Sequence, residues 1–220
     1  MSERGRTINK RERGIGRLVS GLVVGGVLAT VAVLMLGTTA PPAQAWFTRC
    51  DFLTGGGWIL YNGNQGTFGV GGGCKFGSTT WGHLEYQDHG PLGLNVHATS
   101  ITAYFPEGDT LPDSKTGQPT GTRHICGTAR TNLYGDVFFH VRARDAGEPG
   151  VNDQFDLRLC PSLNQACGPN YLYDTTNQCF PHFLGSSAPC SAGNGGGGNI
   201  QLHKPNASTT GDFNDVCPQF

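Results

Sequence analysis

All eight cysteines of this chain follow residue 45, downstream of an apolar segment near its beginning. An even number of cysteines in an exported chain indicates a disulfide framework, because disulfides form and persist outside the cytoplasm. We therefore expect an exported, oxidised domain. Its disulfide residues are Cys50, Cys74, Cys126, Cys160, Cys167, Cys179, Cys190 and Cys217.

The first 45 residues have the three parts of a secretory signal peptide. Six basic residues lie among residues 1–17, the uncharged stretch Leu18–Leu36 follows, and Ala43-Gln44-Ala45 supplies the small residues of a cleavage site. We predict a signal peptide at 1–45 that is cleaved before Trp46, and a secreted protein without membrane insertion after cleavage. The alternative is an uncleaved anchor at residues 18–36, since this stretch approaches the ~20 residues that span a bilayer. In both cases the basic flank stays inside and the remainder is exported.

Residues 46–220 are long enough for one domain with a core of its own. The leader contains six of the 15 basic and two of the 16 acidic residues, so the remaining part carries a net charge of −5. This charge argues against nucleic acid as a partner, because nucleic-acid binding needs a basic surface. Seven of the 35 glycines lie in the leader, and the other 28 indicate tight turns and bulges.

Cysteine spacing suggests, but does not determine, the disulfide pairs. Four cysteines crowd into the segment 160–198, which we interpret as a cystine-rich insertion whose cysteines pair with one another. Cys50 and Cys217 flank the domain and form a second predicted pair, which leaves Cys74 to pair with Cys126. A zinc site is the weaker alternative because the chain contains no C-x-x-C pair.

Two segments alternate between apolar and polar residues, which is typical of strands with one buried and one solvated face. In Val137–Arg144 the odd positions are apolar and His140, Arg142 and Arg144 are polar. In Gln154–Leu159 the residues Phe155, Leu157 and Leu159 share one face. Further strands are predicted at Trp58–Tyr61, Gly66–Val70, Thr79–Gln87, Leu94–Tyr104, His124–Ala129 and Asn199–His203.

These patterns predict an all-β fold, an antiparallel sandwich or barrel of about eight strands. A phase change within Leu94–Tyr104 predicts a bulge near Thr99–Ser100. Pro106–Gln118 is predicted to be a polar surface loop. The expected core includes Phe139, Val141, Phe155, Leu157, Ile200 and Leu202.

An acidic turn offers one candidate metal site. Asp145, Glu148, Asn152 and Asp153 lie in a loop bent by proline and glycine, and Ca²⁺ prefers such hard oxygen ligands. Calcium is therefore the one cofactor for which the sequence provides a candidate. The alternative is a plain turn, in which aspartate and asparagine side chains accept hydrogen bonds from the backbone.

The segment GHLEYQDHG offers a second candidate metal site. His83, Glu85 and His89 share one strand parity, and Asp88 has the other. Two imidazoles and a carboxylate are ligands for a transition metal, with help needed from His97, His140 or His203 on neighbouring strands. The alternative is an ordinary solvated strand face.

Catalytic residues are not assigned, because the chain lacks a G-x-S-x-G elbow and its cysteines are expected to be oxidised. Aromatic side chains could stack on sugars. Trp58 and Trp81 are expected in the core, whereas Tyr171 and Tyr173 are expected to be exposed. Trp46 is a further candidate.

Several motifs resemble the post-COAP domain, a bacterial extracellular module that follows choice-of-anchor domains in surface proteins. The resemblance lies in TGGGWI (54–59), GTFGV (66–70), GHLEYQDHG (82–90), ICGTAR (125–130), RDAGEPGVNDQFDLRL (144–159) and GGNIQLHK (197–204). It implies a β-rich exported domain without an established enzymatic role. The chain departs from the family pattern in the cystine-rich stretch between Leu159 and Gly197, so we expect its four cysteines to stabilise an added loop.

We therefore expect a non-enzymatic, secreted bacterial β-domain that binds or packs at the cell surface or in the extracellular matrix. One alternative is a secreted hydrolase that acts on polysaccharide, with Ca²⁺ as a structural ion. Another is a barrel that binds a small ligand in its interior.

Overall fold

The computed structural model describes residues 50–75, 78–161, 170–193, 196–209, 211–214 and 216–217. The predicted signal peptide, its cleavage site, Trp46 and Cys167 lie outside these ranges. Among the described residues, which begin at 50, none belongs to a helix with the length and hydropathy needed to cross a membrane.

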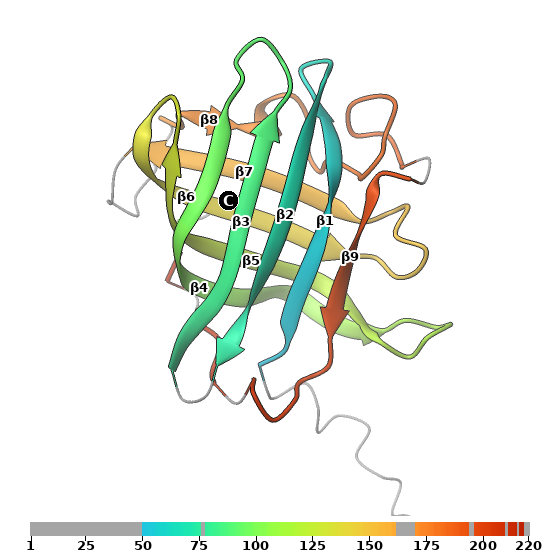
Figure 1. The fold of residues 1–220 in the computed structure, drawn as a ribbon. Helices are drawn as coiled ribbons and strands as arrows, with labels where there is room; N and C mark the ends of the chain where they lie inside the picture. Colours follow the sequence, from blue (N-terminus) through green and yellow to red (C-terminus); the bar gives the residue numbers. More distant parts are fainter. Residues whose placement is uncertain are drawn as a thin grey trace, which may run out of the picture. The chain divides into compact units, whose positions relative to one another are not determined.

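Nine strands and one short turn of 3₁₀ helix, η1, make up the regular structure (Figure 1). They are β1 Phe52–Tyr61, β2 Asn64–Lys75, β3 Ser78–Asp88, β4 Asn95–Pro112, β5 Pro119–Thr131, β6 Gly135–Asp145, β7 Gln154–Pro161, β8 Tyr173–Asp174, η1 Thr175–Asn177 and β9 Gly198–His203. The predicted all-β class is confirmed, and each predicted strand coincides with an observed one. The two-residue strand β8 was not predicted.

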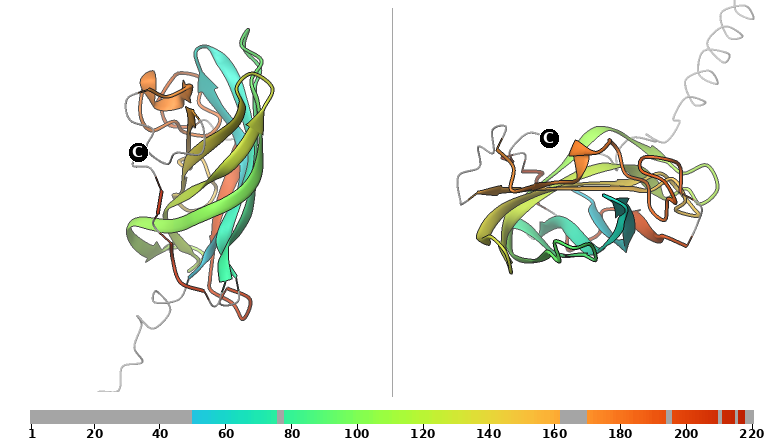
Figure 2. Two further views of the ribbon diagram at one scale, coloured as in Figure 1. Left: turned by 90° about the vertical axis from the view of Figure 1, so that its left-hand side faces the viewer. Right: turned by 90° about the horizontal axis from the view of Figure 1, so that it is seen from above.

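The strands form one antiparallel sheet in the order β8-β7-β6-β5-β4-β3-β2-β1-β9. The sheet folds over so that two layers face each other, as Figure 2 shows in the view from above. Phe68 of β2 and Phe155 of β7 meet between the layers with ring centroids 3.8 Å apart. Among the described residues no strand pairing joins β8 to β9, so the sheet is not closed, which fits a sandwich or an open barrel.

The hairpin between β1 and β2 follows directly from its two loop residues. Asn62 has a φ of 50° and Gly63 has a φ of 77°, and no other residue separates the strands. Asn-Gly is the favoured sequence for such a loop because both positions need a positive φ, which matches the twist of the flanking strands. This hairpin fixes the register of β1 against β2.

The hairpin between β4 and β5 is longer than predicted. The ladder shifts register between Ala98 and Ser100, which confirms the predicted bulge. The prediction of a surface loop at Pro106–Gln118 is wrong over much of its length, because β4 continues to Pro112 and only residues 113–118 form the turn. Asp113 stabilises this turn, since its Oδ1 accepts hydrogen bonds from the backbone N–H groups of Lys115 (3.0 Å) and Thr116 (2.6 Å).

The main core lies between the two layers. All six predicted core residues are buried there. Phe155 contacts both Phe68 and Tyr86 in stacked geometry, so aromatic rings fill the space at this point. Burial of such apolar surface is the main favourable term in the folding free energy.

β6 is buried on both faces, which contradicts the predicted solvated face. His140 and Arg142 are only 2% and 8% exposed, and only Arg144 of the three polar residues is exposed. The His140 Nε2 and His124 Nδ1 atoms lie 2.7 Å apart, and the Arg142 guanidinium stacks 5.0 Å from the centre of the Phe180 ring. The cystine-rich segment therefore supplies part of the cover that period-2 alternation could not reveal.

Two predicted disulfide pairs are wrong. The structure pairs Cys50 with Cys74, because Phe52 and Gly73 are register partners and place these cysteines beside each other. Cys126 pairs with Cys217, since a bridge from Tyr104 to Asn214 guides the C-terminal segment along β4 towards β5.

Pairing within the cystine-rich segment is confirmed for Cys179 and Cys190. Cys160 is also disulfide-bonded. Because Cys167 lies outside the described residues, the rest of this prediction remains untested.

Candidate functional site

One row of register partners crosses five strands on the outer face of the sheet. Gly56 of β1, Gly69 of β2, Glu85 of β3, His97 of β4 and Arg130 of β5 are successive partners. Side chains of directly opposed residues point to the same face of a sheet. The row therefore places two glycines without side chains next to a carboxylate, an imidazole and a guanidinium.

Gly69 of β2 makes the floor of this surface. Phe68 and Val70 point into the core, and Gly69 takes the outward position between them. A Cβ atom at Gly69 would have His83 Nε2, 4.0 Å away, as its nearest neighbour. The backbone at this position is therefore open to close approach by a ligand.

A groove of about 620 Å³ begins at this floor and extends towards β5. We call it the outer-face groove. Side chains that donate or accept hydrogen bonds line most of it, and they belong to Thr67, Glu85, Gln87, Asn95, His97, Thr99, Arg130, Thr131 and Asn132. Such a lining suits a polar, uncharged ligand with many hydroxyl groups.

The charged groups of the groove are paired yet accessible. Glu85 and His97 contact each other, with side chains 56% and 70% exposed. The Nε of Arg130 lies 3.4 Å from the Oδ1 of Asp136, and both of these side chains are also largely exposed. Exposed ion pairs are weak because water screens them, so a ligand can replace one partner of such a pair at little cost in free energy.

Trp58 stands beside the groove. It is the register partner of Thr67, which lines the groove, and it is half-buried. The prediction that Trp58 and Trp81 lie in the core is wrong, because both occupy outward positions of their strands. Trp81 lies at the other end of this face, with its ring 6.1 Å from that of Phe52.

The structure separates most of the histidines proposed as transition-metal ligands. Glu85 and His97 meet, whereas the Nε2 of His89 is hydrogen-bonded to Thr67 Oγ1 at 2.9 Å. His203 stacks on Phe52 at 4.4 Å and contacts Thr54, and His140 is buried with His124. His83 lies over Gly71. This arrangement fits the alternative interpretation, a solvated strand face.

The acidic turn uses its carboxylates to hold the backbone. Asp145 accepts hydrogen bonds from Gly147 N and Leu202 N, each 2.7 Å long. Asp153 accepts one from Ala146 N (2.9 Å) and one from Ile200 N (2.7 Å). All four oxygens therefore have backbone partners without a metal, as the plain-turn alternative expects.

The other two residues of the acidic turn contribute less. Glu148 lies 3.4 Å from Asn199 through its Oε1, and Asn152 is exposed. The hydrogen bonds of these four residues do not converge on one point, so the calcium site stays a prediction.

A second pocket, of about 270 Å³, lies where the β1–β2 hairpin meets the segment around β8. The hydroxyl of Tyr173 donates to Asp88 Oδ2 at 3.1 Å and lies 2.6 Å from the hydroxyl of Tyr86. Burial raises the pKa values of both tyrosines, which keeps the phenols protonated. Tyr173 is buried and Tyr171 is half-buried, so the predicted exposure of Tyr173 is wrong.

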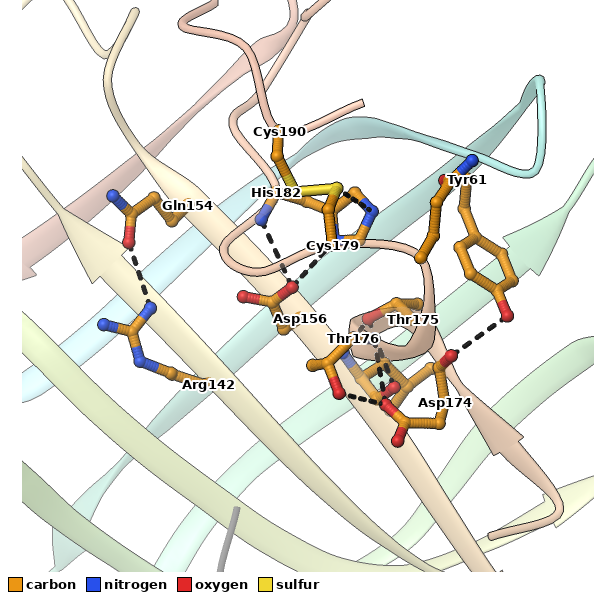
Figure 3. A network of polar contacts seen from close by, with 12 residues as sticks. Tyr61, Arg142, Gln154, Asp156, Asp174, Thr175, Thr176, Cys179, His182 and Cys190 are labelled. Atoms are coloured by element: carbon orange, nitrogen blue, oxygen red, sulfur yellow. Dashed lines mark hydrogen bonds and ion pairs between the residues drawn. A yellow bond between two sulfur atoms is a disulfide. The ribbon is translucent and has the colours of Figure 1, made fainter. Parts of the chain in front are cut away.

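A buried polar network lies on the outer side of β7 (Figure 3). His182 Nδ1 and Asp156 Oδ1 are 2.8 Å apart, and both side chains are almost completely buried. Burial raises the pKa of Asp156. The disulfide between Cys179 and Cys190 lies beside the imidazole.

Sequence reasoning missed both the groove floor and this network, for different reasons. The floor has a visible signal, since Gly69 stands between the apolar residues Phe68 and Val70 in the sequence. The pair of Asp156 and His182 has none, because only the folding of the cystine-rich segment onto β7 brings these residues together.

Comparisons of this chain with protein-family models, curated proteins and solved structures give no match.

Proposed function

We propose that this chain is an exported, non-enzymatic module that binds neutral polysaccharide at the bacterial cell surface or in the extracellular matrix, through the outer-face groove. The row from Gly56 to Arg130 carries the proposal, because it joins an open backbone floor to a wall of hydrogen-bonding side chains. The leader and the resemblance to the post-COAP domain support export and a binding role.

The chemistry of the groove favours carbohydrate over other ligands. Sugar hydroxyls both donate and accept hydrogen bonds, and the groove offers carboxylate, amide, hydroxyl and imidazole groups to match them. The aromatic ring of Trp58 at its border offers an apolar surface for the C–H face of a sugar ring. A net charge of −5 over residues 46–220 favours a neutral polymer over an anionic one.

The small number of carboxylates in the groove supports binding without hydrolysis. Glycosidases generally use two carboxylates on opposite sides of the bond that they cleave. Glu85 is the one carboxylate among the described residues that line the groove. This leaves no second carboxylate there for acid–base chemistry.

A glycan array probed with residues 46–220, followed by calorimetry on the best oligosaccharide, tests the proposal. The variant Gly69→Val fills the floor in a position where its Cβ has room. We expect at least a tenfold loss of affinity in this variant, with a melting temperature that is unchanged or higher.

Arg144→Val is the matched control, since it changes an exposed strand residue of β6 outside the groove. Its affinity should equal that of the wild type. Unaltered binding by Gly69→Val would contradict the proposed site, and release of reducing sugar during the incubations would favour the hydrolase instead.

A further inference from the structure

The disulfide between Cys179 and Cys190 lies beside an oriented imidazole. The Nε2 atom of His182 is 3.7 Å from Sγ of Cys179 (Figure 3). A histidine at this distance from sulfur can stabilise a thiolate or take up a proton from a thiol.

Asp156 holds the imidazole in this position. Its Oδ1 accepts from the backbone N–H of His182 at 3.2 Å and lies 2.8 Å from His182 Nδ1. The carboxylate therefore favours the tautomer with the proton on Nδ1, which directs the Nε2 lone pair towards the sulfur. Both side chains are at most 1% exposed, so water competes little for these contacts.

The second oxygen of Asp156 adds an independent observation. Asp156 Oδ2 is buried and has no hydrogen-bond partner in the part of the chain that the structure describes. A carboxylate oxygen without a partner is costly in a protein interior, and such groups call for an explanation. A positive charge that forms on His182 during a reaction would offset this cost.

We propose that Cys179–Cys190 is a reactive disulfide that exchanges with external thiols, with Cys179 as the leaving sulfur beside His182. An external thiolate attacks Sγ of Cys190 and forms a mixed disulfide, while the S–S bond breaks and its electron pair goes to Cys179. His182 takes up a proton from solvent at Nε2, and the resulting imidazolium stabilises this thiolate or gives that proton to it. A second external thiol then releases Cys190 as a thiol, so that two thiols are oxidised to one disulfide and the protein gains two thiols.

The surface position of Cys190 permits attack by an external thiolate. Cys190 is half-buried, and its neighbours Pro189 and Ser191 are exposed. Cys190 also has a φ of 52°, a backbone conformation that is unfavourable for residues other than glycine and is stored at functional sites.

The other described disulfides provide internal comparisons. Cys50 and Cys74 are fully buried. Cys126 is fully buried and Cys217 is half-buried, and His140 lies close to the disulfide that they form. The protein therefore offers one fully buried disulfide and one half-buried disulfide with a nearby imidazole for comparison.

Reduction by glutathione of the protein comprising residues 46–220, with alkylation and mass spectrometry at intervals, measures each disulfide separately. We expect Cys179–Cys190 to open at least tenfold faster at pH 7 than Cys50–Cys74 and Cys126–Cys217. His182→Asn should slow this step at least tenfold at the same pH. Equal rates for the three disulfides, or an unchanged rate in His182→Asn, would overturn the proposal.

A second measurement guards against misfolding of a variant with a changed buried residue. Cys190→Ser leaves Cys179 as a thiol, and its alkylation by iodoacetamide is followed against pH. We expect the pH of half-maximal alkylation to lie well below about 8.5, the ordinary pKa of a cysteine thiol. When Asp156→Asn is added to remove the positioning carboxylate, this pH should return towards that value. A midpoint at or above the ordinary value in a folded Cys190→Ser protein would also overturn the proposal.

Discussion

Asp145 and Asp153 stabilise the fold by accepting backbone hydrogen bonds with their side-chain carboxylates. Each carboxylate accepts one hydrogen bond from the turn after β6 and one from β9. Burial raises the pKa of both, and that of Asp153 reaches about 7. Near neutral pH the protein therefore bears the cost of burying a charge at position 153.

This cost predicts a pH dependence of stability. A carboxyl group whose pKa is higher in the folded than in the unfolded state binds more protons when folded, so its contribution to the unfolding free energy falls as pH rises between about 4 and 7. Urea unfolding at several pH values should show the wild type gaining stability over Asp153→Asn as pH falls from 7.5 to 4.5. The wild type is compared with Asp153→Asn because a second group also makes stability depend on pH. Burial lowers the pKa of His124 to about 4, so its contribution to the unfolding free energy rises with pH in both proteins and cancels in the difference. A stability difference between the two proteins that stays constant with pH would contradict the raised pKa of Asp153.

The identity of core residues was predictable, but the environment of polar residues was not. Period-2 alternation reveals which side of a strand is apolar, and it correctly placed Phe139 and Val141 in the core. It cannot reveal that another segment covers the polar side. His140 and Arg142 are buried for this reason, through contacts with His124 and Phe180 that are distant in sequence.

At the scale of the element, β2 has glycines on both of its faces, and the space around them differs between the inner and the outer face. A Cβ at Gly72 would lie 2.9 Å from Ile125 Cδ1 and 3.0 Å from a ring atom of Tyr104. At Gly69 the nearest atom is 4.0 Å away. The inward glycine therefore accommodates the core, and the outward one leaves the groove floor open.

This contrast predicts opposite effects of one substitution at two positions of one strand. Gly72→Val should lower the unfolding free energy by about 1–3 kcal/mol, because it overpacks the core. Gly69→Val should be neutral or raise it by up to about 1 kcal/mol, since valine favours strand conformation. Chemical denaturation of both variants checks this, and equal destabilisation would contradict the assigned faces.

Long alternating elements were predictable from sequence, whereas elements defined by tertiary contact were not. β6 and β7 followed from their periodicity. β8 has only two residues and exists because Arg158 and Leu159 of β7 pair with it. The outer-face groove could be anticipated only in part, from Glu85 and His97, because its shape depends on the register across five strands.

At the scale of the whole molecule, the disulfides connect parts of the chain over different distances. Cys126 and Cys217 are separated by 91 positions, and Cys179 and Cys190 by 11. Loop-closure entropy predicts that removal of the longer link costs about 4–5 kcal/mol and removal of the shorter about 3 kcal/mol. Double cysteine-to-serine variants compared by urea unfolding test this, and a larger loss for the shorter link would show that contacts within its loop dominate.

The cystine-rich segment is integrated into the fold more closely than the sequence suggested. His182 O accepts a hydrogen bond from Phe155 N at 3.1 Å, and Leu184 N donates one to Asp153 O at 2.9 Å. Tyr173, His182 and Leu184 are buried. An added loop that could be lost without consequence would not bury such residues against β7.

Joint replacement of Cys160, Cys167, Cys179 and Cys190 by serine tests this integration. We now expect a lower melting temperature, because the cover of β6 and β7 loosens. An unchanged cooperative transition would support the added-loop interpretation.

The two turn aspartates have one further consequence, for self-association. A strand at the end of a sheet offers free N–H groups on which another chain can add a strand, and this is a route to aggregates. β9 occupies such a position, but the N–H groups of Ile200 and Leu202 already donate to Asp153 and Asp145. The carboxylates occupy the donors that a second copy would need, so the addition of a strand at β9 is disfavoured.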